Sequence, residues 1–131
     1  MDKESRLINE EYFKSLITRE IKMCLLKENY KVGIYTFIYQ QHKYVLDIIK
    51  NIIQDIGLIK NNHTYILIVF DNGSFIKILS CDKSIRGDRF NDVIINNLIN
   101  RQDVDEVILP TLRFYEDDTN NIRDKVFYCE F

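Results

Sequence analysis

Short, continuous apolar runs constrain the fold of this chain most. Strands buried on both faces of a sheet lack polar alternation. Two longer segments, residues 5–28 and 45–56, instead space apolar residues by three and four, as amphipathic helices do. Gly57 follows the second segment as a predicted helix end. The predicted strands are "VGIYTFIY" (32–39), "TYILIVF" (64–70), "FIKILS" (75–80), "DVIIN" (92–96) and "KVFYCEF" (125–131).

The order of these segments predicts one α/β domain over residues 1–131. Three layers are expected: a mostly parallel central sheet with helices on both faces. "DNGS" at 71–74 predicts a tight turn, and therefore a β-hairpin. Residues 98–113 suit either a helix or a short strand, and Pro110 limits both.

Composition excludes several classes of protein. The net charge of −2 over 131 residues provides no general basic field for nucleic acid. No apolar run is long enough to span a bilayer, and the acidic N-terminal segment is unlike a signal peptide. Three cysteines without a CxxC pair predict reduced thiols in a cytoplasmic protein. The absence of alanine and the abundance of Ile, Asn and Lys indicate an A+T-rich genome, such as that of a low-GC bacterium or one of its phages.

Few residues suggest catalysis. Neither His42 nor His63 has a Ser, Cys or carboxylate at a recognised motif spacing, so both are expected to be solvated or capping residues. Aspartates at strand ends and loops suit turns, although the same positions would also suit a magnesium site. These are Asp71, Asp82, Asp88 and Asp92. We expect no metal or other cofactor.

From residue 64 onward, the order of motifs resembles the ATPase domain of phage large terminases and helicase-like P-loop proteins. "TYILIVF", "DNGS", "FIKILS", "SIRGDRF" and "NDVIIN" correspond to a strand, an NGS-type turn, a second strand, a Ser-x-Arg-Gly loop and the Walker B strand. The helix at 5–28 lies where the helix after the phosphate loop would lie. The resemblance implies a P-loop-like fold.

The chain departs from this family where the chemistry is done. No Gly precedes the first helix, and no GK[ST] occurs. Asn96 and Asn97 stand where Walker B acids would hold Mg²⁺ and polarise water. The resemblance therefore implies a pseudo-ATPase with a degenerate Walker B strand, and no nucleotide cofactor.

The loop before that strand offers binding chemistry. Lys83, Arg86 and Arg89 lie within seven residues, although Asp82 and Asp88 reduce the local charge. A solvated loop with internal ion pairs is the simpler interpretation, and contact with nucleic acid or an acidic protein is the functional one. Phe114 and Tyr115 precede an acidic run and could be an exposed epitope or a strand end. The candidate partner-binding residues are Lys83, Arg86, Arg89, Phe114 and Tyr115.

The leading hypothesis is a non-catalytic interaction protein that blocks or scaffolds a protein or nucleoprotein partner. The alternative is a magnesium-dependent nuclease or nucleotide-processing enzyme that uses the loop aspartates. A third hypothesis is a fragment that supplies the missing half of a separate ATPase chain.

Overall fold

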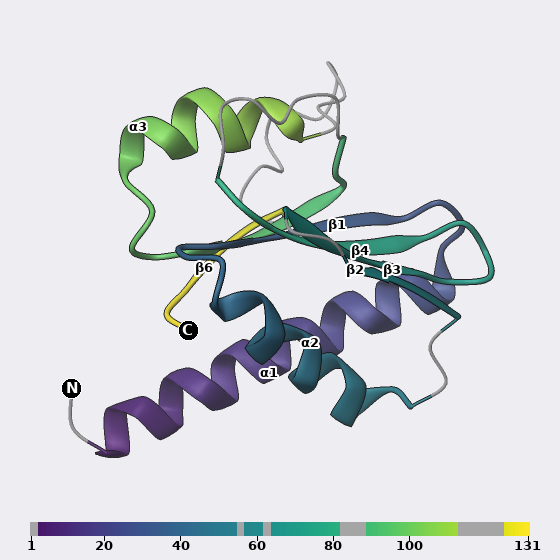
Figure 1. Ribbon diagram of the computed structural model, residues 1–131, viewed down its shortest axis with the longest axis horizontal. Helices are drawn as coiled ribbons and strands as arrows, with labels where there is room; N and C mark the ends of the chain where they lie inside the picture. The colour runs from purple at the N-terminus through teal and green to yellow at the C-terminus, as the bar shows by residue number, and fades with distance from the viewer. Residues whose placement is uncertain (1–2, 55–56, 62–63, 82–88, 113–124) are drawn as a thin grey trace.

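The computed structural model describes residues 3–54, 57–61, 64–81, 89–112 and 125–131. Its centre is a six-stranded mixed sheet in the order β2-β3-β4-β1-β5-β6 (Figure 1). Strands β4, β1, β5 and β6 run parallel, and β2 and β3 are antiparallel to their neighbours. The predicted α/β class and mostly parallel sheet are confirmed. The strands are β1 (Lys31–Thr36), β2 (Leu58–Asn61), β3 (Tyr65–Val69), β4 (Phe75–Ser80), β5 (Asp92–Asn96) and β6 (Val126–Cys129).

Helical segments lie on both faces of the sheet. Helices α1 (Lys3–Leu26) and α2 (Gln41–Ile52) cover one face (Figure 1). On the other face, α3 (Arg101–Asp103) continues into a π-helical turn, η1 (Val104–Ile108), and a 3₁₀ turn, η2 (Leu109–Thr111). The structure thus resolves the ambiguous 98–113 segment as helical over 101–111.

The sheet separates two apolar cores. On the α1 and α2 face, residues such as Phe13, Ile17 and Ile49 pack against Ile34 and Ile78. The core on the α3 face is formed by Tyr35, Leu79, Phe90, Val93, Ile95, Val104, Ile108 and Leu112. Burial on both faces explains why β1 and β5 lack polar alternation.

Gly33 in β1 gives space to the core on the α3 face. A Cβ atom at this position would lie 2.8 Å from the ring of Phe90, which is fully buried. Phe90 in turn packs edge-on against Tyr35, with the ring centroids 6.1 Å apart. The glycine is therefore required by close packing of an aromatic ring on the strand.

The structure departs from the expected elements most clearly in three places. Helix α2 ends at Ile52, because Ile53 is already extended, and Gly57 is not its cap. Strand β1 ends at Thr36, so the apolar run that follows it leaves the sheet. The short strand β2, which pairs with β3, was not predicted because four residues carry too little periodicity.

The turn between β3 and β4 caps the C-terminal end of α1. Asn72 donates its side-chain amide to the carbonyls of Cys24 and Lys27, at 2.7 and 3.0 Å. The Ser74 hydroxyl also donates to the Lys27 carbonyl, at 2.7 Å. Gly73, with φ of 84°, takes the left-handed conformation that this turn needs. The turn thus satisfies carbonyls that the helix end leaves free.

Candidate functional site at the carboxyl edge of the sheet

The four parallel strands end at one edge of the sheet, on the left in Figure 1. Open α/β sheets place their ligand sites outside the carboxyl ends of such strands. Here the loops after β1 and β5 lie side by side, because those two strands are paired. We call this side of the molecule the carboxyl edge.

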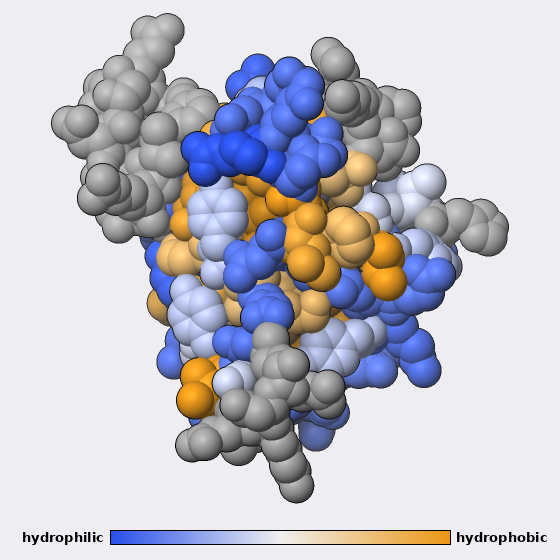
Figure 2. Space-filling view, turned by 90° about the vertical axis from the view of Figure 1, so that its left-hand side faces the viewer, coloured by the Kyte–Doolittle hydropathy of each residue, from blue (hydrophilic) through white to orange (hydrophobic). Residues whose placement is uncertain are grey.

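Large apolar side chains are exposed at the carboxyl edge. Three follow β1 consecutively, and one follows β5. Figure 2 faces this side and shows an apolar patch with polar residues above it. The apolar rim, as we name the set, comprises Phe37, Ile38, Tyr39 and Leu98, which are 48, 46, 53 and 60% exposed. An exposed cluster of this kind is typical of an interaction site.

Two amide side chains hold the backbone of the apolar rim. Gln41 accepts from the backbone N–H of Phe37 at 2.8 Å and of Ile38 at 3.3 Å. Asn96 accepts from the N–H of Leu98 at 2.9 Å. Both amides also donate to the carbonyl of Phe131, at 2.9 and 2.8 Å. One carbonyl thus ties the two rim loops together.

The two hydrogen bonds of the Asn96 side chain require an amide group. Its side chain is buried and uses both halves of the group, the oxygen as acceptor and the nitrogen as donor. A carboxylate could accept from Leu98 but would repel the carbonyl of Phe131. Asn97 is exposed, and its backbone N–H pairs with Cys129. Asn96 therefore has a structural role.

A buried histidine lies behind the rim. His42 Nε2 is 3.1 Å from the Ser80 hydroxyl, which is 3.2 Å from that of Thr36. His42 Nδ1 is buried and has no hydrogen-bond partner among the described residues. Burying Nδ1 as an unpaired acceptor costs less free energy than burying it as an unpaired N–H donor, so we assign the proton of the ring to Nε2. His42 then donates to Ser80 and does not act as its base, which argues against a Ser–His nucleophile.

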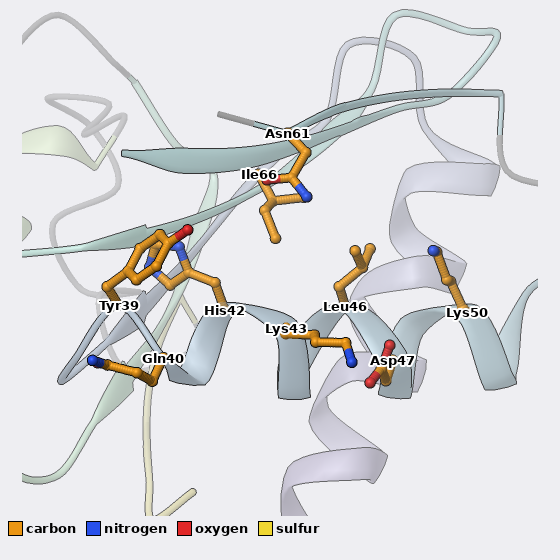
Figure 3. Close-up of a pocket in the computed structure, with 9 residues that line it drawn as sticks. All are labelled: Tyr39, Gln40, His42, Lys43, Leu46, Asp47, Lys50, Asn61 and Ile66. Atoms are coloured by element: carbon orange, nitrogen blue, oxygen red, sulfur yellow. The ribbon is translucent and has the colours of Figure 1, made fainter. Parts of the chain in front are cut away.

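A cavity of about 490 Å³ opens beside this histidine, between α2 and strands β2 and β3 (Figure 3). Its lining combines an apolar wall with cationic, amide and aromatic groups. The lining residues are Tyr39, Gln40, His42, Lys43, Leu46, Asp47, Lys50, Asn61 and Ile66.

No protein-family model, curated protein or solved structure matches this chain. The geometry of the site therefore carries the functional argument.

The structure tests only part of the predicted binding loop. Arg89 is exposed and precedes β5, whereas Asn96 ends it, so the two lie at opposite edges of the sheet. Lys83, Arg86, Phe114 and Tyr115 lie outside the described residues.

The aspartates do not assemble into a metal site in the described part of the chain. Asp71 is exposed in the β3–β4 turn. Asp92 is buried at the start of β5, where it accepts from Tyr30 at 2.5 Å and from Arg19 at 3.2 Å. Asp82 and Asp88 lie outside the described ranges. Within those ranges, no three His, Cys, Asp or Glu side chains are grouped to hold an ion.

Sequence reasoning missed the rim and the acidic cluster around Asp92. Phe37, Ile38 and Tyr39 extend an apolar strand without interruption, and only the polar pair Gln40–Gln41 marks the change. Glu20 is fully buried beside Asp92 and Arg19, although its position in α1 looked unremarkable. Across the described residues, no helix has the length and apolar character needed to cross a membrane.

Proposed function

We propose that this chain is a non-catalytic interaction protein that binds a protein partner through the apolar rim and so blocks or scaffolds it. The exposed cluster at the carboxyl edge is the observation that carries this function. Aromatic side chains are enriched in protein interfaces, where a few buried anchors carry most of the binding energy. The amide clamp from Gln41 and Asn96 supports the proposal, because a held loop loses less conformational entropy on binding.

The polar groups of the carboxyl edge favour binding over catalysis. Asn96 and Gln41 are committed to backbone hydrogen bonds, and His42 donates to Ser80. A chain related to P-loop ATPases would, with these groups, be a pseudo-ATPase that retains the fold and lacks the phosphate chemistry. We therefore also propose that this chain is a degenerate relative of the P-loop ATPases.

A reducing setting such as the cytosol fits the proposal. Cys24, Cys81 and Cys129 are free thiols. Burial raises the pKa of Cys24 to about 12 and that of Cys129 to about 11, so neither is a reactive thiolate at neutral pH. The net charge of −2 favours a protein partner over nucleic acid, and the 83–89 loop is a second proposed contact.

A matched pair of leucine substitutions tests the function. Leu98 lies in the rim, and Leu26 is 81% exposed at the opposite end of the molecule, at the end of α1. Affinity capture from the source cells would compare wild type, Leu98→Ser and Leu26→Ser by quantitative mass spectrometry. We expect a partner that wild type and Leu26→Ser retain and that Leu98→Ser loses.

With that partner purified, Leu98→Ser should weaken binding by about tenfold, or ~1.4 kcal/mol, by calorimetry. Equal recovery of every protein by all three forms would contradict the proposal that the partner binds at the apolar rim. Unchanged melting temperatures for both variants would show that the loss is not caused by unfolding.

A further inference from the structure

The cavity between α2 and the β2–β3 strands has features of a small-molecule site. Its volume of about 490 Å³ falls within the range of such sites. Leu46 on α2 and Ile66 on β3 are largely buried in the core and form an apolar wall at the cavity (Figure 3). This wall would suit an apolar group.

The two ends of the cavity carry different chemistry. Lys50 lies in the last turn of α2 and extends toward the strands in Figure 3. Lys43 also borders the cavity but runs along α2 toward Asp47 in that view, so we assign the anion-binding role to Lys50. This end therefore favours an anion.

His42 marks the other end with an unused acceptor. It is 97% buried, yet Nδ1 has no partner within the described residues. Burial lowers the pKa of His42, so the ring is neutral at pH 7 and Nδ1 carries a lone pair. A ligand hydroxyl would satisfy this buried acceptor.

Tyr39 packs against His42 at this end of the cavity. Its ring lies edge-on to His42, with the centroids 5.2 Å apart, and it is about half exposed. An exposed side chain changes rotamer within nanoseconds. Rotation of Tyr39 would open Nδ1 to the cavity and place an aromatic face against the bound molecule.

We propose that this cavity binds a small, elongated hydroxylated organic acid with an aromatic body. The carboxylate pairs with the Lys50 ammonium, the ring lies against the wall that Leu46 and Ile66 form, and the hydroxyl donates to His42 Nδ1. His42 and Lys50 are separated along the helix by about 12 Å, at 1.5 Å per residue. Because the lysine side chain is flexible, its ammonium can lie closer to His42 than this separation, at a distance that a hydroxyphenyl acid can span.

Three probes separate the contributions of the two ends. They are 3-(4-hydroxyphenyl)propionate, 3-phenylpropionate, which lacks the hydroxyl, and 3-(4-hydroxyphenyl)propan-1-ol, which lacks the charge. Titration of the isotope-labelled full chain by NMR should move resonances of Tyr39, His42 and Lys50 with the first probe. We expect each truncated probe to bind at least about fivefold more weakly. The ¹⁵N resonance of His42 Nδ1 should shift only with the hydroxylated acid or alcohol.

A lysine pair provides the matched control. Lys50→Gln should weaken the binding of 3-(4-hydroxyphenyl)propionate at least about fivefold, so that this acid no longer binds more tightly than the alcohol. Lys22→Gln, on the exposed side of α1, should leave the affinity unchanged. The proposal is overturned if no lining resonance saturates by roughly 10 mM probe. It is equally overturned if all three probes bind alike, or if both lysine variants behave alike.

Discussion

At the residue scale, two carboxyl groups are buried together on the α1 face of the sheet. Glu20 and Asp92 lie together with the Arg19 guanidinium, which bridges them, and Tyr30 donates to Asp92. Burial, reinforced by the neighbouring Asp92, raises the pKa of Glu20 to about 9. Glu20 is therefore protonated in the folded chain at neutral pH, whereas an unfolded chain would ionise it.

The pKa of Glu20 predicts a pH dependence of folding. Between its ordinary value of 4.5 and about 9, the folded chain binds the proton more tightly than the unfolded chain. The contribution of Glu20 to stability is therefore complete below pH 4.5 and is lost as pH rises toward 9. The slope in this window approaches ~1.4 kcal/mol per pH unit at most.

Glu20→Gln should remove most of this slope, because a neutral amide has no proton to lose. Urea unfolding from pH 5 to pH 9 would measure it, and the variant should be more stable than wild type at pH 8. Glu11→Gln, at an exposed position on the same helix, is the control and should follow wild type. Parallel pH profiles for wild type and Glu20→Gln would show that Glu20 is already ionised in the fold.

At the element scale, α1 ends where the β3–β4 turn supplies hydrogen-bond donors. The Asn72 amide reaches two carbonyls of the helix end, and its oxygen accepts from the Ser74 backbone N–H at 3.0 Å. One side chain thus links a helix to a hairpin distant in sequence. The turn was predicted from "DNGS", but its contact with α1 depends on tertiary packing.

Asn72→Ala should destabilise the domain by about 1–3 kcal/mol, since the partly buried Cys24 carbonyl loses its donor and the Lys27 carbonyl keeps only the Ser74 hydroxyl. Chemical denaturation would measure the loss. Asn51→Ala, at an exposed position in α2, should change stability by no more than about 0.5 kcal/mol. A similar, small effect of both substitutions would mean that water replaces the cap without cost.

The positions of these strands could be predicted from sequence because a continuous apolar run indicates a strand that is buried on both faces of a sheet. Phe75–Ser80 and Asp92–Asn96 were predicted with the boundaries that the structure shows. The apolar rim was not predicted because the buried and the exposed parts of "VGIYTFIY" contain the same types of apolar side chain. The Glu20–Asp92 pair escaped it because residues 72 positions apart meet only when α1 packs on the sheet.

At the scale of the whole molecule, the resemblance to P-loop ATPases predicts a chain that does not respond to nucleotide. The printed sequence contains no GK[ST] motif, and Asn96 is engaged by Leu98 and Phe131. Millimolar Mg-ATP should leave the melting temperature unchanged relative to Mg²⁺ alone. A saturable rise of several degrees, which a ligand well above its dissociation constant would produce, would refute the pseudo-ATPase proposal.

The central position of β1 has a consequence for synthesis. Thr36 meets its neighbour Ser80 44 residues later, and Lys31 meets Asn91 60 residues later. At ribosomal speed, the wait for the first partner lasts roughly 2 to 9 s, given the 44-residue separation. During that time a strand that is buried on both faces in the fold remains unpaired as the chain grows. Recovery of soluble protein should therefore depend on translation rate and on chaperone supply more than the stability of the finished domain would suggest.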